Sequence, residues 1–166
     1  MAMPSILSDQ PLVPSLLDRL LDDDPAQTRE PMKARHQVLR EMKLSLRRDL
    51  ENLLNTRRRA GSRPPHLTEL ERSLVNYGIP DITGMDVSAS DVREQLRGVI
   101  ETAVREFDPR FKSVRVEMLP PAAGAERTLR FRIDAVVYAA PAFEDVVFDS
   151  SWEPISGEIE VKGAAR

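Results

Sequence analysis

The spacing of apolar residues along this chain predicts two amphipathic helices followed by a series of strands. Apolar residues recur three and four positions apart from about Glu30 to Asn55 and again up to Phe107, which is the spacing of one buried helix face. From residue 114 onwards, apolar and charged residues alternate, as in a half-buried strand. Pro109 accounts for the change of period, because proline restricts the residue before it to an extended conformation and cannot donate a helical hydrogen bond.

The N-terminal part is predicted to be an extension that carries one short helix. A proline can occupy the first turn of this helix, whose apolar residues include Leu16, Leu17 and Leu20. A run of aspartates then ends it. We therefore divide the chain into an extension, residues 1–25, and a domain, residues 26–163.

Capping residues predict two further helix boundaries. Thr68 and Glu71 have the spacing of a capping box, which predicts a short helix that ends at Tyr77. Ser88 or Ser90 can cap the second long helix.

The last part of the chain is predicted to complete the sheet. Residues 129–137 alternate between apolar and polar positions and follow a turn rich in proline, which predicts a hairpin with the preceding strand. Shorter strands are predicted at Val146–Phe148 and at Ile159 with Val161. Helices first and consecutive antiparallel strands afterwards indicate an α+β fold, in which one mostly antiparallel sheet packs against helices on one face.

Composition excludes several classes of protein. With 166 residues, 41% of them hydrophobic, the chain is long enough to bury a core of its own. It has no cysteine and two histidines, so we expect no disulfide, no thiolate chemistry and no histidine-rich metal site. No apolar run approaches the ~20 residues of a membrane span, and neither a signal peptide nor a cofactor motif is recognisable. We therefore expect a cytoplasmic protein without a cofactor.

Charge is distributed unevenly along the chain, although the net charge is only −3. Residues 29–63 hold eleven lysines and arginines against four acids, whereas residues 134–160 hold seven acids and no lysine or arginine. Such a dipolar chain can steer charged partners to its two ends, or it can simply be solubilised by both.

Six segments share their order and spacing with a known family. They read SLLDRL (15–20), LRRDLENLLNTR (46–57), SLVNYGIPD (73–81), FDPRF (107–111), LRFRIDA (129–135) and SGEIEV (156–161). In this combination, which covers about residues 13 to 163, the chain resembles the TssE family of type VI secretion baseplate components, relatives of a phage-tail wedge protein long labelled lysozyme-like. The family's signature is usually Glu-Pro-Arg, whereas here it is Asp108-Pro109-Arg110, in which the acid is one methylene shorter.

The resemblance implies a structural protein of the cytoplasmic baseplate, assembled at the inner face of the cell envelope, on which the contractile sheath begins to polymerise. It implies docking on the wedge proteins TssF and TssG, with TssK as a further candidate, and pairing with the sheath proteins TssB and TssC. Catalysis, nucleic-acid binding and membrane insertion are not part of this role.

The candidate docking residues lie at a corner and in the N-terminal helix. Asp108, Pro109 and Arg110 form a rigid corner, and with the family in mind we expect Arg110 to pair with a partner carboxylate. Alternatively, Arg110 folds back on local carbonyls. The partner hypothesis predicts that Arg110→Ala leaves a folded protein that no longer joins the wedge. The leucines of the N-terminal helix could dock separately or pack against their own domain.

The resemblance also implies that sheath strands add to a free edge of the sheet. Such pairing uses main-chain hydrogen bonds for affinity and side chains for register. The candidate pairing residues are Val146, Val147, Phe148, Ile159 and Val161. The same residues could instead belong to ordinary edge strands whose neighbouring acids prevent self-association.

Two other functions were weighed against this one. A glycosidase needs two carboxylates across a cleft about 5 to 10 Å wide. Glu101, Glu106 and Asp108 crowd one helix end, but among arginines that would pair with them. The arginines at 57–59 and 63 could bind nucleic acid, yet they lack the aromatic residues or recognised fold of specific binders.

Overall fold

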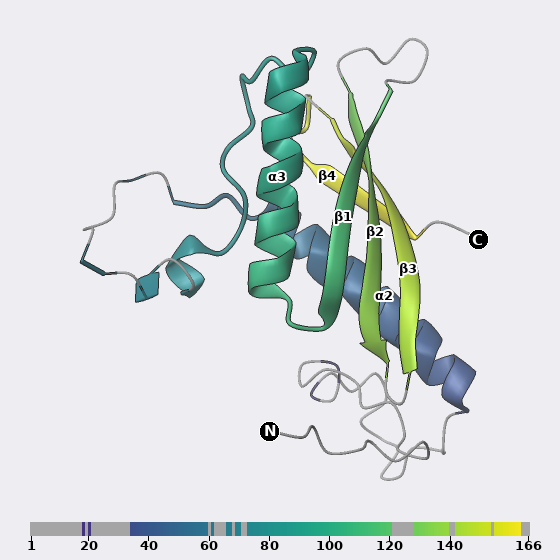
Figure 1. Cartoon of the computed structure of the whole chain (residues 1–166). Helices are drawn as coiled ribbons and strands as arrows, with labels where there is room; N and C mark the ends of the chain where they lie inside the picture. Colours follow the sequence, from purple (N-terminus) through teal and green to yellow (C-terminus); the bar gives the residue numbers. More distant parts are fainter. Residues whose placement is uncertain are drawn as a thin grey trace.

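Two helices and a four-stranded antiparallel sheet make up the part of the chain that the computed structural model describes, which is residues 18, 20, 34–59, 61, 66–67, 69–70, 73–120, 128–139, 142–153 and 155–163 (Figure 1). The elements are α2 (Arg35–Asn55), the 3₁₀ helix η2 (Leu74–Asn76), α3 (Ser90–Phe107), β1 (Phe111–Leu119), β2 (Leu129–Ala139), β3 (Ala142–Trp152) and β4 (Ile159–Gly163). The predicted α+β class is confirmed.

Helix α2 presents the predicted apolar face to the core but begins later than the predicted start at Glu30. Its buried residues include Leu46, Leu50 and Leu54. Ala34 precedes the helix in an extended conformation, and its N–H donates to Gln37 Oε1 at 2.9 Å. This hydrogen bond satisfies a backbone donor at the start of the helix, so the helix begins at Arg35.

Helix α3 has the predicted apolar stripe, but the prediction of its cap was wrong. The residue before the helix is Ala89, which makes no side-chain cap hydrogen bond. The N–H and the hydroxyl of Ser88 both bond to Asp86 Oδ1, which forms a local turn, and Ser90 already lies inside the helix.

The prediction of a helix that ends at Tyr77 is also wrong, as far as its residues are described. The chain makes short 3₁₀ turns there, because the hydroxyl of Ser73 and the amide of Asn76 both donate to the Leu70 carbonyl, at 2.9 and 2.7 Å. Thr68 and Glu71, the expected capping pair, lie outside the described residues.

The strands follow chain order in the sheet, β1-β2-β3-β4, and each neighbouring pair is antiparallel. The predicted β1–β2 hairpin and the last strand are confirmed. Strand β3, predicted only at Val146–Phe148, runs from Ala142 to Trp152, because it pairs with β2 along its whole length. Its acids sit mostly at positions that alternate with buried ones, so they do not interrupt the strand.

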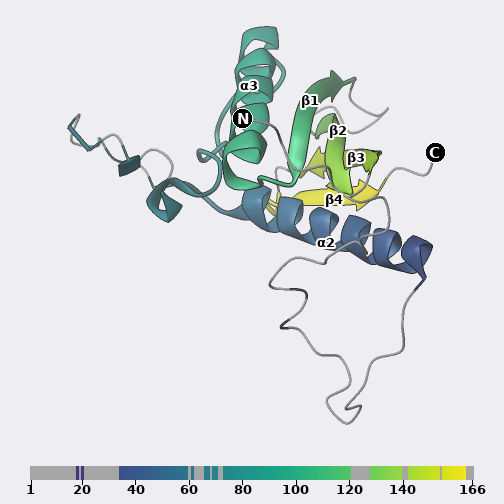
Figure 2. The ribbon, with the colours of Figure 1, turned by 60° about the horizontal axis from the view of Figure 1, so that its bottom comes forward.

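One face of the sheet is buried against the helices. Alternate residues of β2 are buried from Leu129 to Ala139, and helix α3 packs on β1 while α2 packs on β4 (Figure 2). No helix of the described residues is long and apolar enough to cross a membrane. The division into residues 1–25 and 26–163 stays a prediction, since most of the first segment lies outside the described residues.

Candidate functional site

The corner after α3 is closed by hydrogen bonds within its own tripeptide. The N–H of Asp108 still makes a helical hydrogen bond to the Val104 carbonyl, at 3.1 Å, and the extended conformation of Asp108 before Pro109 then ends the helix. Asp108 Oδ1 accepts from the backbone N–H and Nε of Arg110 at 3.1 and 2.9 Å, and Oδ2 accepts from Arg110 Nη2 at 2.6 Å. The shorter acid at position 108 therefore still reaches the guanidinium in a two-pronged pair.

This pair continues into helix α2. Arg110 Nη2 also donates to Asp49 Oδ2 at 2.7 Å, and Asp49 Oδ1 accepts from Arg48 at 3.1 Å. Arg48 Nη2 and the Ser45 hydroxyl then hold the Asp18 carboxylate, at 2.9 and 2.7 Å. We call these residues the corner network: Asp18, Ser45, Arg48, Asp49, Asp108 and Arg110.

The electrostatics of the corner network favour its charged forms. Burial acts to lower the pKa of Arg110, but the hydrogen bonds and charges of Asp108 and Asp49 outweigh burial and raise it. The pKa of Arg48 is raised chiefly by its hydrogen bond to Asp18. Both guanidinium groups are thus held as permanent cations by acids of the same chain.

In the structure, Arg110 is paired with acids of its own chain. Its guanidinium is bonded to side-chain carboxylates and not to local carbonyls, and its side chain is only 26% exposed. Asp108 is buried, whereas Pro109 is exposed. Whether these three residues dock on a partner stays a prediction, but the unpaired guanidinium that the hypothesis assumed is paired within the chain.

The N-terminal candidates are only partly described. Leu16 and Leu17 lie outside the described residues. Leu20 is 74% exposed, while Asp18, two positions earlier, is bonded to Ser45 and Arg48 on α2. Of these two described residues, Asp18 thus contacts α2 through its carboxylate, whereas Leu20 is exposed.

The outer edge of β1 is covered by side chains of helix α3. The N–H of Val116 donates to Glu101 Oε1 at 2.9 Å, and the Val114 carbonyl accepts from Arg105 Nη2 at 3.2 Å. In an antiparallel edge strand, every second residue points its N–H and carbonyl away from the neighbouring strand, and Val114 and Val116 point theirs away from β2. Glu101 and Arg105 consequently take the place that a further strand would occupy.

The opposite edge of the sheet is capped where β4 begins. The side-chain amide of Asn55 exchanges two hydrogen bonds of 2.8 Å with the N–H and carbonyl of Ile159, at the start of β4. Strand β4 then pairs with β3 only from Trp152 to Phe148. The stretch of β3 from Ala142 to Val147 has no strand on that side within the described residues.

The candidate pairing residues lie on β3 and β4, on this less covered side. The side chains of Val146, Phe148, Ile159 and Val161 are buried in the core, and Val147 points to the outer face. Only their main-chain groups could therefore meet an added strand. Sequence reasoning placed these residues near an edge but missed Asn55 and Glu101, because a cap made by a distant side chain leaves no periodic signal.

Two of the three acids considered for a glycosidase are paired within the chain. Glu101 bonds to Arg97 at 3.0 Å and to the N–H of Val116, and Asp108 bonds to Arg110. Glu106 is exposed. Among the described residues no group of histidines and acids could hold a metal ion.

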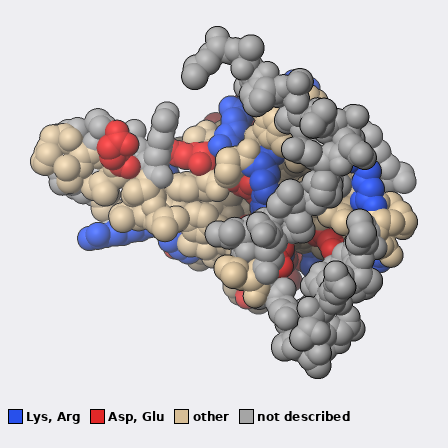
Figure 3. Space-filling view, turned by 90° about the horizontal axis from the view of Figure 1, so that it is seen from below, with Lys and Arg blue, Asp and Glu red and all other residues tan. Residues whose placement is uncertain are grey.

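The basic and acidic stretches of the sequence meet where Lys43 on α2 pairs with Glu144 on β3 at 2.8 Å. Arg57, from the basic stretch, approaches Asp81, which lies outside the acidic stretch, at 3.5 Å. Seen from below, acidic and basic side chains lie interspersed among the described residues (Figure 3). The exposed Arg58 and Arg59 remain as a small basic surface.

The described residues form a small α+β domain in which the corner network is internal and residues 142–147 of β3 have no neighbouring strand on the side of β4. The sequence profile of the family described as baseplate wedge protein gp25 matches residues 40–142, well over half of the chain. The chain belongs to that family, and its role is a structural one in a phage-tail-like baseplate. The matched region contains α2 from residue 40 onwards, all of α3, β1 and β2, and the corner tripeptide. Comparison with curated proteins gives no match.

Proposed function

We propose that this protein is a wedge component of a type VI secretion baseplate and that it initiates the contractile sheath by accepting a strand at an open sheet edge. Membership of the gp25 family supports the baseplate role. The six segments that resemble TssE support the assignment to type VI secretion, with assembly at the cytoplasmic face of the envelope. The observation that supports strand addition is a structural difference between the β1 edge of the sheet and the β3–β4 edge.

Free strand edges invite pairing with other chains, so proteins cover the edges that must not pair. Here Glu101 and Arg105 bond to the outer edge of β1. In contrast, the stretch of β3 from Ala142 to Val147 has no neighbouring strand on the side of β4 within the described residues. Along an edge strand, the main-chain groups of successive residues point alternately towards and away from the neighbouring strand. Those of Ile159 point away from β3, towards Asn55, so those of Lys162 point towards β3 and pair with Asp149. By the same alternation, the main-chain groups of Val147 point to the open side and can bind a sheath strand.

The surface next to the corner is the proposed contact with the other wedge proteins. A hollow of about 520 Å³ lies beside the exposed Pro109, lined among others by Asn52, Tyr77 and Phe107. The Tyr77 and Phe107 rings meet edge to face with centroids 5.2 Å apart, which fixes the wall of the hollow. On this proposal the corner network shapes the docking surface for TssF and TssG, and Pro109 contributes a direct contact.

The test of strand addition is a single substitution at Val147 in the full-length protein. Val147→Pro removes an N–H that points to the open side and not to β2, so the change leaves the β2–β3 ladder intact. Val147→Thr is the matched control, because it keeps the N–H and changes only the side chain. Each tagged variant is expressed in native cells and its co-purifying proteins are identified, with its melting temperature measured in parallel.

We expect the wild type and Val147→Thr to recover both the wedge proteins and the sheath pair TssB and TssC. Val147→Pro should retain the wedge proteins and lose the sheath pair. Recovery of the sheath pair at wild-type level by a folded Val147→Pro variant would refute strand addition at this edge. Absence of every baseplate protein from the wild-type sample would refute the type VI assignment itself.

A further inference from the structure

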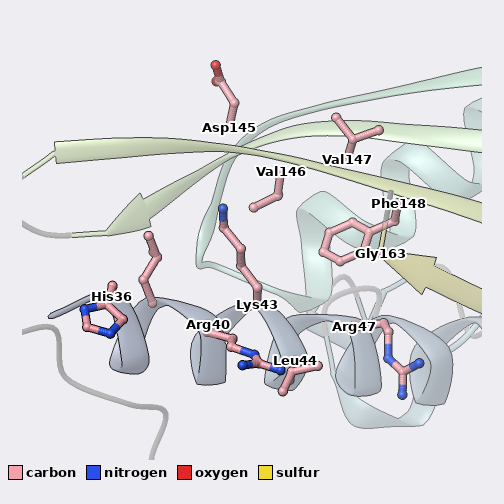
Figure 4. A pocket seen from close by; sticks show the side chains of 11 residues that line it. His36, Arg40, Lys43, Leu44, Arg47, Asp145, Val146, Val147, Phe148 and Gly163 are labelled. Carbon is pink, nitrogen blue, oxygen red and sulfur yellow. The ribbon is translucent and has the colours of Figure 1, made fainter. Parts of the chain in front are cut away.

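A groove runs between helix α2 and the uncovered part of β3, directly beyond the end of β4. It has a volume of about 510 Å³ and is lined by α2 from His36 to Arg47, by β3 from Asp145 to Phe148 and by Gly163. Val146 and Phe148 point towards α2, whereas Asp145 and Val147 point away from it (Figure 4). A strand that continued the line of β4 would lie in this groove, with β3 beside it and α2 beneath it.

The floor and the rim of the groove differ in chemistry. Leu39, Leu44, Val146 and Phe148 contribute apolar surface. The basic residues that line it are on α2 at positions 36, 40, 43 and 47, a spacing that places them along one side of the helix. Of these residues, Arg40, Lys43 and Arg47 are cations. Lys43 points from α2 towards β3, whereas the one acid of the lining, Asp145, points away from α2 (Figure 4).

Two of these cations have no partner within the described residues. Lys43 is paired with Glu144, but no acid is in ion-pair contact with Arg40 or Arg47. The Nε of Arg47 is moreover buried without a hydrogen-bond acceptor in the described part of the chain. A buried donor without an acceptor is unfavourable, so the groove is electrostatically incomplete as it stands.

We propose that this groove binds an extended segment of a partner protein in which acidic and apolar residues alternate or are mixed. The main chain of the segment pairs with β3 at Val147 in the register that turns its carboxylates towards α2, where they bind Arg40 and Arg47, and its apolar side chains lie on the other face of the sheet, beside Val147. The inference rests on the proposed function, since the partner that supplies such a strand is a sheath protein. The inference adds that the bound strand is acidic, because main-chain pairing at the open edge does not by itself select a charge.

The acid of the N-terminal segment whose contacts are described does not reach these cations. Asp18 is held by Ser45 and Arg48 on α2, and neither of these residues lines the groove.

The test uses the purified full-length protein and fluorescently labelled, capped peptides, with binding followed by anisotropy. One peptide alternates valine and glutamate, and its counterpart alternates valine and lysine. The variants are Arg40→Gln with Arg47→Gln, and Arg58→Gln with Arg59→Gln as a control that removes the same charge from an exposed surface outside the groove. Val147→Pro and Val147→Thr are measured alongside.

We expect the glutamate peptide to bind at least about tenfold more tightly than the lysine peptide, which corresponds to a few rim ion pairs. The groove double variant should weaken glutamate-peptide binding about fivefold or more, and the control double variant should leave it unchanged. Equal binding of the two peptides, or equal loss in both double variants, would overturn the acidic-strand inference.

Three further outcomes separate this inference from its alternatives. If Val147→Pro blocks both peptides while charge has no effect, strand addition stands and only the acidic preference fails. If Val147→Pro binds the glutamate peptide like the wild type, strand pairing in the groove fails. If a single-stranded oligonucleotide displaces the peptide as effectively as unlabelled peptide does, the groove is a general polyanion site and the inference is wrong.

Discussion

The substitution Arg110→Ala removes the guanidinium that joins Asp108 to Asp49, and we expect it to destabilise the whole domain. Asp108 is only 8% exposed and accepts three hydrogen bonds from Arg110, two of them from the guanidinium. Asp49 loses its bond to Nη2 as well. The variant therefore leaves a buried carboxylate without its cation and brings no replacement donor.

The size of the effect follows from the burial of the pair. Breaking a fully buried ion pair costs about 3 to 5 kcal/mol, because the remaining charge is neither hydrated nor paired. The side chain of Arg110 is 26% exposed, so water can reach part of the cavity and we expect a loss of about 2 to 3 kcal/mol. For a chain of this length, that corresponds to a melting temperature lower by roughly 5 to 10 °C.

Thermal and urea unfolding of the full chain, followed by circular dichroism at neutral pH, measures this loss. Arg132→Ala is the matched control: Arg132 pairs with Asp149 at 2.8 Å, but both side chains are 41% exposed, so its melting temperature should stay close to that of the wild type. If Arg110→Ala unfolds at the same temperature as Arg132→Ala, the corner network does not stabilise the fold and the reasoning is wrong.

This expectation changes how a docking experiment at Arg110 is interpreted. The sequence-based hypothesis required that Arg110→Ala stay folded and lose its partners. Because the guanidinium is bonded to Asp49 and Asp108, loss of partners by this variant could follow from loss of structure. Pro109 is exposed and outside the network, so Pro109→Ala separates docking from stability more cleanly.

Three further predictions concern the residues around these surfaces. Gly78→Ala should lower the free energy of unfolding in urea by at least about 2 kcal/mol, since φ is +104° and the added Cβ would lie 2.2 Å from the Thr56 carbonyl oxygen; an unchanged midpoint would contradict this. Glu101→Ala should cost about 1 to 3 kcal/mol and promote self-association in light scattering, because the N–H of Val116 loses its acceptor; a stable, monodisperse variant would show that the edge needs no cover. Burial and neighbouring carboxylates raise the pKa of Tyr77, so its phenol should ionise in an ultraviolet titration above the usual value near 10; the stability it contributes is complete below that value and is lost as the pH rises through the folded-state pKa, and Tyr77→Phe should remove both signals.

The long elements could be predicted from the sequence because their information is local. Spacings of three and four residues identified the buried faces of α2 and α3, and alternation identified β1 and β2. Short elements were less predictable, since capping depends on which neighbour a hydroxyl finds. Ser88 bonds to Asp86 and so does not cap α3, and hydrogen bonds to the Leu70 carbonyl accompany short 3₁₀ turns where a helix up to Tyr77 was expected.

Periodicity and the order of the six segments by themselves determined the α+β class, the positions of the main helices and strands, and the resemblance to baseplate proteins. The tertiary structure alone decided which groups meet across the chain. Arg110 finds Asp49 at a separation of 61 residues, and Asn55 finds Ile159 at a separation of 104. The physical reason is that apolar spacing records which face of an element is buried, whereas hydrogen bonds and ion pairs depend on the angles at which separate elements cross. The covered edge of β1 and the open groove beside β3 therefore became visible only when helices and strands were packed together.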